Sequence, residues 1–175
     1  MTTWRPIPGW HGFYEASDTG LIRSLPRTVR HSIGGTRHVQ ERILKPSQNQ
    51  KGYRIVVLAR DGKRYAYPVH RLVAETFLGP LPEGWHTCHI DGDNQNNHVT
   101  NLRYATPSEN NRDVVRHGRN HNANKTHCPQ GHPYSPENTQ VTRGGRGRKC
   151  LTCHRERTRS RRAAQRAARL YDQAA

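Results

Sequence analysis

Residues 87–110 read TCHIDGDNQNNHVTNLRYATPSEN and carry the strongest local signals in the chain. TCHI suits one short strand and NLRYA suits a second, because turn-forming residues separate them. The DGDNQNN run between them is rich in residue types that tolerate turns and left-handed backbone. TPSE then supplies an N-cap, a proline at the first helical position and a glutamate at the third. The sequence therefore predicts a polar-looped β-hairpin followed by a helix from Pro107 to about His117, before Gly118.

Three polar side chains in this stretch suggest hydrolytic chemistry, namely His89, Asn101 and Asn110. An unperturbed histidine titrates at about 6.5, so His89 can serve as a general base toward water near neutral pH. Asn110 falls in the first turn of the predicted helix and faces back toward the hairpin. Its amide oxygen is a suitable ligand for a hard divalent cation such as Mg²⁺. The plainer alternative is that His89 and the asparagines only cap a polar hairpin.

The spacing of twelve positions from His89 to Asn101 and nine from Asn101 to Asn110 resembles the His-Asn-His signature of HNH endonucleases, in the variant that ends in asparagine. The resemblance implies a ββα-metal (His-Me finger) nuclease core. It also implies that His89 is the catalytic base, that Asn101 braces the loop, and that Asn110 binds a catalytic Mg²⁺ or Mn²⁺.

One position departs from the family pattern. Family members commonly carry an aspartate before the histidine, where it shares the metal, whereas this chain has Cys88. A thiolate is a poor ligand for Mg²⁺. The second catalytic metal ligand therefore stays open among Cys88, Asp91, Asp93, His70 and water. Phage-type relatives resemble this chain in carrying Cys-His here, so cleavage is still expected.

The composition of the 175-residue chain indicates a polyanionic partner. Lysine and arginine total 29 against 13 acidic residues, a formal charge of +16 with a pI near 10.7. Only 31% of residues are hydrophobic and the mean hydropathy is -1.04, which leaves room for one modest domain with appendages. No apolar run approaches the roughly 18 residues of a membrane span, and the amino terminus lacks a signal-peptide core. We expect a cytoplasmic protein in a bacterial cell, with its four cysteines reduced.

The amino-terminal segments WRPIPG, YEAS and GLIRS resemble the NUMOD4 module found beside HNH domains, and they lie at residues 4–9, 14–17 and 20–24. The family associates this module with DNA contact. Two short strands, at 13–16 and 21–25, are predicted around a Ser-Asp-Thr-Gly turn. Arg23 and Arg27 can then reach phosphates. Alternatively, the aromatic residues of this segment simply build a small core of their own.

The middle of the chain predicts a loop, a hairpin and a helix. Residues 27–42 form a basic stretch in which Gly34-Gly35 marks a loose, mobile loop. Asp61-Gly62 is the strongest hairpin signal and separates strands at 54–58 and 64–67. A helix is expected over 68–78, ended by Gly79-Pro80, and its His-Arg-Leu-Val-Ala run resembles one that often precedes the HNH centre. In that helix His70 either caps the packed start or contacts phosphate.

The carboxy-terminal part carries a second metal pattern. Cys128-x3-His132 and Cys150-x2-Cys153 are separated by 17 residues and supply three thiolates and one imidazole, which suits tetrahedral structural zinc. A tail with so little apolar content needs the metal to fold. His127 and His154 stand beside the named ligands and could substitute for them. Similar ribbons occur at the ends of phage and actinobacterial HNH proteins.

A basic helix is predicted to follow this ribbon. Residues 143–169 hold eleven basic residues against Glu156 alone, and alanines become frequent from Ala163 onward. A helix from Arg155 could be a solvated surface, but uncompensated arginines favour contact with phosphates. The expected DNA-binding residues here are Arg155, Arg157, Arg159, Arg161, Arg162 and Arg166.

The sequence therefore predicts an α+β protein with four parts: a NUMOD4-like module at 1–45, an HNH nuclease core at 46–118, a linker at 119–126, and a zinc-binding segment with a basic helix at 127–175. The predicted function is metal-dependent hydrolysis of phosphodiester bonds in double-stranded DNA. The main alternative is a non-catalytic DNA-binding protein on the same scaffold, which Cys88 keeps open. An RNA-binding zinc ribbon would leave the pattern from His89 to Asn110 unexplained.

Overall fold

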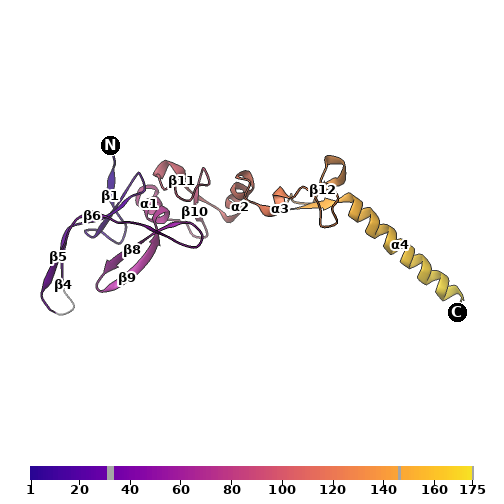
Figure 1. Ribbon diagram of the computed structural model, residues 1–175, viewed down its shortest axis with the longest axis horizontal. Helices are drawn as coiled ribbons and strands as arrows, with labels where there is room; N and C mark the ends of the chain where they lie inside the picture. The colour runs from indigo at the N-terminus through magenta and orange to yellow at the C-terminus, as the bar shows by residue number, and fades with distance from the viewer. Residues whose placement is uncertain (31–33, 146, 175) are drawn as a thin grey trace. The chain divides into compact units, whose positions relative to one another are not determined.

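The computed structural model describes residues 1–30, 34–145 and 147–174, which fall into two compact units. The first unit is Met1–His117 and the second begins at Gly118. The mixture of strands and helices (Figure 1) confirms the predicted α+β class. Residues 119–126 were expected to be a plain linker, but they contain a one-turn helix, α3 (His121–Asn124). Asn120 caps this turn by accepting a hydrogen bond from the backbone N–H of Ala123, at 3.0 Å.

The amino-terminal part of the first unit is built from short antiparallel strands. One sheet has the order β1-β2-β3-β6, with β1 (Trp4–Pro6), β2 (Tyr14–Ser17), β3 (Ile22–Ser24) and β6 (Arg42–Ile43). The predicted pair of strands corresponds to β2 and β3. The outer strands β1 and β6 were not predicted, because they are only 3 and 2 residues long.

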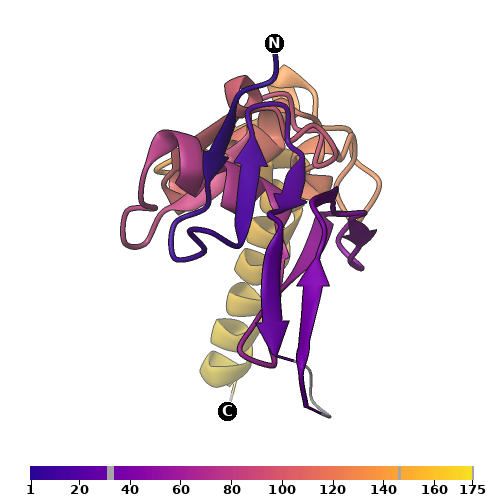
Figure 2. The same ribbon diagram turned by 90° about the vertical axis from the view of Figure 1, so that its left-hand side faces the viewer.

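The basic stretch was expected to be a loose loop, and this expectation was wrong for most of its length. It forms a hairpin of β4 (Arg27–Arg30) and β5 (Thr36–Val39), which extends away from the four-stranded sheet in Figure 2. Gly34 and Gly35, at φ +96° and +80°, supply the left-handed backbone that lets the chain reverse. Residues 31–33 of the predicted loop lie outside the described residues.

A second sheet and a helix follow, as predicted. The sheet has the order β7-β8-β9, with β7 (Ser47–Gln48), β8 (Arg54–Arg60) and β9 (Lys63–Pro68). Asp61 and Gly62 both take positive φ, 52° and 74°, which a two-residue turn between twisted strands requires. Helix α1 (Val69–Leu78) starts directly after β9, and Gly79 is its C-cap.

The predicted strand, loop, strand and helix are all present. They are β10 (His86–His89), the 3-10 turn η1 (Val99–Asn101), β11 (Leu102–Ala105) and α2 (Pro107–Arg116). The two strands are antiparallel, with His89 opposite Leu102. The capping box at Thr106 is complete, because its hydroxyl accepts from the Glu109 N–H and the Glu109 carboxylate accepts from the Thr106 N–H.

One hydrophobic core serves the whole first unit. Ile7, Trp10 and Tyr14 of the amino-terminal part are buried together with side chains of β8, α1 and β11. The Tyr14 hydroxyl accepts a hydrogen bond from the backbone N–H of Ala59 on β8, at 2.9 Å. The predicted boundary between residues 45 and 46 thus lies within one continuous core. The aromatic side chains do not form a separate core of their own.

The second unit contains a small ribbon and a long helix. Its elements after α3 are η2 (Pro136–Asn138), β12 (Thr139–Val141), β13 (Arg148–Cys150) and α4 (Leu151–Ala174). The helix begins four residues before the predicted Arg155. It does so because the Cys150 sulfur accepts from the Cys153 N–H at 3.5 Å, while the Asn138 amide oxygen accepts from the Thr152 N–H at 2.9 Å. No helix among the described residues is long and apolar enough to cross a membrane.

Candidate HNH site and zinc cluster

His89 lies at the end of β10 and is buried, with 9% of its surface exposed. Its Nε2 lies 3.1 Å from the side-chain oxygen of Asn97. The Asn97 amide nitrogen donates to the carbonyl oxygen of Gln95 at 3.3 Å, which orients the amide oxygen toward the histidine. Because an amide oxygen can only accept, neutral His89 carries its proton on Nε2 and leaves Nδ1 free to accept one.

Asn101 braces the loop between the two strands. Its amide nitrogen donates to the Asp91 carboxylate at 2.9 Å and to the carbonyl oxygen of Asn96 at 2.8 Å. Its amide oxygen accepts from the backbone N–H of Asp91 at 3.0 Å. One buried side chain therefore ties both ends of the polar loop together. The carboxylates of Asp91 and Asp93 are themselves occupied by loop hydrogen bonds.

The loop is also fastened to two distant segments of the first unit. Asn94 donates to the carbonyl oxygen of Lys51 at 3.0 Å, and Arg54 donates to the side-chain oxygen of Gln95 at 3.0 Å. The amino-terminal turn also approaches the loop closely. A Cβ placed on Gly20 would lie 2.9 Å from both the Cβ and the carbonyl oxygen of Asn97. The residue that holds His89 is thus packed against the amino-terminal segment.

Two aromatic side chains pack around the ring of His89. Tyr53 is stacked on it with ring centroids 6.1 Å apart, and the His70 ring lies 5.1 Å away. Burial, followed by the nearby His89 and Arg71, lowers the pKa of His70 to about 3. His70 is therefore neutral near pH 7 and adds no positive charge beside His89. Sequence reasoning missed Tyr53, which lies in no recognisable motif, and Asn97, which is one of four consecutive amides in the polar loop.

The opposite side of β10 faces α2. Successive strand residues point to opposite faces, so Cys88 turns away from His89, toward the charges of Glu109 and Asp113. Burial raises the pKa of the Cys88 thiol, so it stays protonated. Asp113 is buried and paired with Arg103 and Arg116. Asn110, half-buried on α2, makes no side-chain hydrogen bond within the part of the chain that the structure describes.

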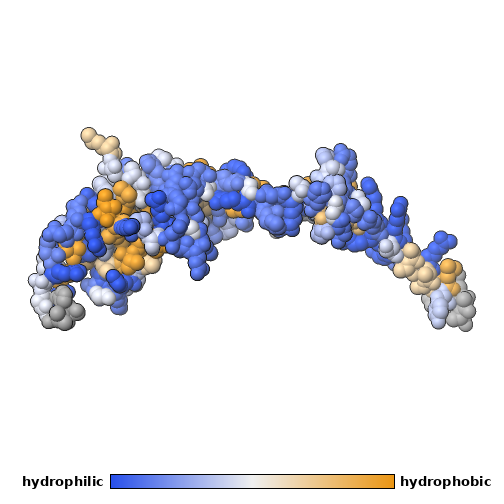
Figure 3. Space-filling model, viewed as in Figure 1, coloured by the Kyte–Doolittle hydropathy of each residue, from blue (hydrophilic) through white to orange (hydrophobic). Residues whose placement is uncertain are grey.

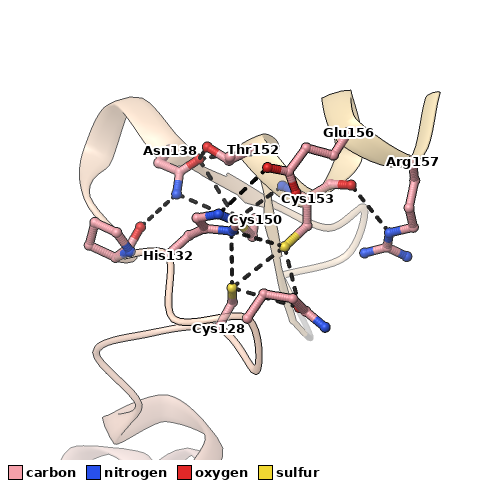
Figure 4. A network of polar contacts seen from close by, with 10 residues as sticks. Cys128, His132, Asn138, Cys150, Thr152, Cys153, Glu156 and Arg157 are labelled. Carbon is pink, nitrogen blue, oxygen red and sulfur yellow. Dashed lines mark hydrogen bonds and ion pairs between the residues drawn. The ribbon is translucent and has the colours of Figure 1, made fainter. Parts of the chain in front are cut away.

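The four predicted zinc ligands converge in the second unit. The ligand atoms of Cys128, His132, Cys150 and Cys153 all lie within 4.8 Å of one another, and Figure 4 shows the side chains turned toward one centre. His132 Nδ1 lies 3.6 Å from the Cys128 sulfur and 3.2 Å from that of Cys153. His127 and His154 are not part of this group among the described residues.

Neighbouring groups orient the His132 ring and favour the thiolate of Cys150. His132 Nε2 lies 3.7 Å from the Glu156 carboxylate, a partner that can fix the ring with Nδ1 toward the sulfurs. The backbone N–H of Cys153 lowers the pKa of Cys150 to about 6, because it donates to that sulfur at the start of α4. Burial and the two neighbouring thiols raise the pKa of Cys153 to about 12. A bound cation would stabilise the thiolate form of both cysteines at once.

The two amino-terminal arginines that were predicted to contact DNA are held by protein contacts. Arg23 forms ion pairs with Glu15 at 2.6 Å and Glu41 at 3.0 Å, and it lies 4.4 Å over the Trp4 ring. Arg27 donates to the carbonyl oxygens of Phe13 and Leu25. Their role toward DNA stays a prediction. A nearby groove of about 490 Å³ is lined by further cations, namely Arg37, Arg42, Lys45 and Arg64, besides Arg27.

Comparison with known proteins agrees with this architecture. Residues 3–59 match the NUMOD4 motif, and residues 67–112 match the HNH endonuclease family. The segment 67–112 is therefore similar to the HNH endonuclease family. The HNH match includes His89, Asn101 and Asn110, together with Cys88. The roles of these residues rest on their geometry and on the resemblance. The second unit lies outside both matched segments.

Two proteins similar to this chain come from viruses. DNA endonuclease I-HmuI of Bacillus phage SP01 is 34% identical over 105 residues, covering 59% of this chain and 52% of that protein. The uncharacterized HNH endonuclease L245 of Acanthamoeba polyphaga mimivirus is 36% identical over 67 residues, covering 38% and 20% of the two chains. This chain thus spans about half of the first relative and less of the second.

A solved structure is similar to much of the chain as well. It describes DNA binding and cleavage by the HNH homing endonuclease I-HmuI, and it matches with a TM-score of 0.54 and 33% identity. The match covers 67% of this chain and 60% of that one. This likeness supports the predicted ββα nuclease core.

Proposed function

We propose that this protein is a metal-dependent endonuclease that hydrolyses phosphodiester bonds in double-stranded DNA. The observation that carries the proposal is the geometry of His89, which ends a strand of the HNH domain and is oriented through Nε2 by Asn97. HNH nucleases depend on a metal, and the named relatives are endonucleases of phage and virus. The same likeness supports a mobile-element role in the cytoplasm of a bacterial host.

The protein's own contribution to the reaction follows from this geometry. Asn97 fixes the His89 ring, so Nδ1 is the nitrogen that takes a proton from the attacking water. Tyr53 and neutral His70 limit movement of the ring. Asn101 keeps the loop closed beneath it. These contacts hold the base in place before DNA binds, which is the arrangement that favours the transition state.

On the α2 side of β10, Asn110 suits a divalent cation and Cys88 does not. Asn110 has an amide oxygen without a side-chain partner among the described residues, and Mg²⁺ or Mn²⁺ accepts such a ligand. The protonated Cys88 thiol suits these ions poorly. Asn110 would therefore hold the ion together with water and DNA phosphates. When bound, such an ion polarises the phosphate and stabilises charge on the leaving oxygen.

The two units contribute to DNA binding in different ways. The cation-lined groove beside β4 and β5 lies in the first unit, within the reach of a phosphate backbone. In the second unit, Zn²⁺ bound by the three cysteines and His132 would be structural, because all four protein ligands are supplied and none is left for substrate. The net charge of +16 gives the whole chain a strong attraction to DNA.

Cleavage of supercoiled plasmid in Mg²⁺, in Mn²⁺ or in EDTA tests the proposal, and it distinguishes nicking from double-strand cleavage. We expect metal-dependent cleavage that His89→Ala abolishes while DNA affinity stays within about twofold, because a base acts mainly in the transition state. His86→Ala is the matched control, since His86 is exposed on the same strand. A His89→Ala protein that cuts as fast as wild type would refute the assignment.

Cys88 favours one alternative, a DNA-binding protein that has lost catalysis. Its buried thiol replaces the oxygen ligand that the family commonly has, so a catalytic ion could be lost without any change in the DNA-binding surface. Tight DNA binding with no cleavage in any divalent ion would establish this alternative.

A further inference from the structure

Helix α4 carries its arginines in an ordered pattern. Five of them follow spacings of four, three, four and three residues: Arg155, Arg159, Arg162, Arg166 and Arg169. At about 100° per residue, these positions fall within an arc of about 80° on one side of the helix. Along the axis they span about 21 Å, at about 1.5 Å per residue. They form a single straight row, which we call the arginine stripe.

The other side of α4 differs in character. Arg157 and Arg161 point roughly away from the stripe, at about 200° and 240° on the same wheel. Later turns fill that side with alanines, which stabilise the helix without adding charge. All seven arginines are exposed. In Figure 3 the visible face of α4 is hydrophilic near the ribbon, and more hydrophobic atoms, tan and orange, appear beside blue ones toward its far end.

The stripe has no neutralising partner in the part of the chain that the structure describes. Among the side chains that the structure describes, none of its five arginines forms an ion pair. Neighbours three and four residues apart on a helix lie close enough to repel, so each consecutive pair destabilises the isolated helix. The acidic Glu156 lies off the stripe and faces His132 instead. Such a row is favourable when a partner supplies a matching row of negative charge.

We propose that the arginine stripe docks along the phosphate backbone of double-stranded DNA. One strand of the duplex carries a phosphate about every 3.4 Å along the axis, so a row of cations about 21 Å long spans about six phosphates of that strand. The zinc cluster would fix the start of this row, because Cys150 caps α4 and Cys153 lies two residues before Arg155. Contact with phosphates holds a protein on DNA without selecting a sequence. This inference rests on the proposed DNA function and assigns the contact to one face of one helix.

Two double variants of the full chain test the face directly. Arg159→Gln/Arg162→Gln removes two stripe charges, and Arg157→Gln/Arg161→Gln removes two charges from the other side. Both variants change the net charge equally. Zinc content is measured in both, because Arg157 also donates to the carbonyl oxygen of Cys153 at 3.3 Å. Duplex affinity is measured over a range of salt without added Mg²⁺, so that no cleavage occurs and zinc is retained.

The stripe variant should reduce the slope of log affinity against log salt by about 1.8, at about 0.9 per phosphate contact, while the control stays near wild type. An equal loss of salt dependence in both variants would overturn the proposal, because DNA would then have no preferred face of α4. No loss in either would also overturn it. A face preference on phosphatidylserine vesicles but not on DNA would assign the stripe to membranes instead.

Plasmid cleavage at low salt separates this inference from the proposed nuclease. If the wild-type protein does not cut but the stripe variant alone loses salt dependence, the endonuclease proposal fails and the docking face stands. If wild type and both variants cut alike and bind alike, the nuclease stands and the docking face fails.

Discussion

Gly20→Ala tests whether the amino-terminal segment positions the catalytic base. Gly20 has φ +89°, and an added Cβ would meet the Cβ, the carbonyl oxygen and the carbonyl carbon of Asn97 at 2.9, 2.9 and 3.0 Å. Two of these atoms are backbone, so the clash cannot be relieved by rotating a side chain. The left-handed conformation costs about 1–2 kcal/mol for alanine, and overpacking adds about 1–3 kcal/mol. We expect a loss of about 2–5 kcal/mol in the free energy of unfolding.

The clash should displace Asn97 and thereby affect the active site. Asn97 holds His89 Nε2 at 3.1 Å, so moving its backbone changes the direction of the base. A misplacement of about 1 Å can lower the rate about 100-fold. We expect kcat to fall by about 10-fold to 100-fold, with DNA affinity much less affected because binding rests on positive charge spread over the whole chain. Denaturant unfolding gives the stability, and single-turnover plasmid cleavage under conditions where the variant is fully folded gives the rate.

Gly12→Ala provides the matched control. Gly12 also has positive φ, +74°, in the same segment, but nothing lies within 4 Å of its added Cβ. It should lose only the backbone contribution of about 1–2 kcal/mol and keep the wild-type kcat. If Gly20→Ala loses no more stability and no more activity than Gly12→Ala, the turn does not brace Asn97 and the reasoning is wrong.

Three further outcomes follow from the site. His70 has a pKa of about 3 in the folded protein against 6.5 ordinarily, so its contribution to stability is complete above pH 6.5 and is lost as the pH falls toward 3. Between pH 6.5 and 5, the free energy of unfolding should therefore fall by about 2 kcal/mol more in wild type than in His70→Phe. Parallel curves of this free energy against pH would contradict the prediction. Cys88→Asp should keep or raise Mg²⁺-dependent cleavage if the position faces the ion, whereas loss in both Cys88→Asp and Cys88→Ser, with the fold intact, would show that the thiol is needed for packing. Cys128→Ser should release zinc and unfold the second unit alone, which metal analysis and circular dichroism measure; an unchanged zinc content would remove Cys128 from the ligands.

The parts of the fold that could be predicted are those set by local chemistry. Asp61-Gly62 fixes one hairpin turn because both residues accept positive φ, and Thr106 with Glu109 fixes the start of α2. Short strands such as β6 have too few residues to show any alternation. The start of α4 was missed for a related reason. Its cap is the sulfur of Cys150, which sequence reasoning treats only as a metal ligand.

The candidate site shows the same limit at the level of single side chains. The run from Asn94 to Asn97 consists of four amides that local propensity treats alike, as residues suited to a turn. In the fold, Asn94 reaches the carbonyl oxygen of Lys51, Gln95 meets Arg54, and Asn97 alone holds the His89 ring. The first two roles depend on contacts with residues 43 and 41 positions away. The type of chemistry can thus be predicted from the His89 spacing, whereas the choice of supporting amide is set by tertiary packing, through the close approach of Gly20.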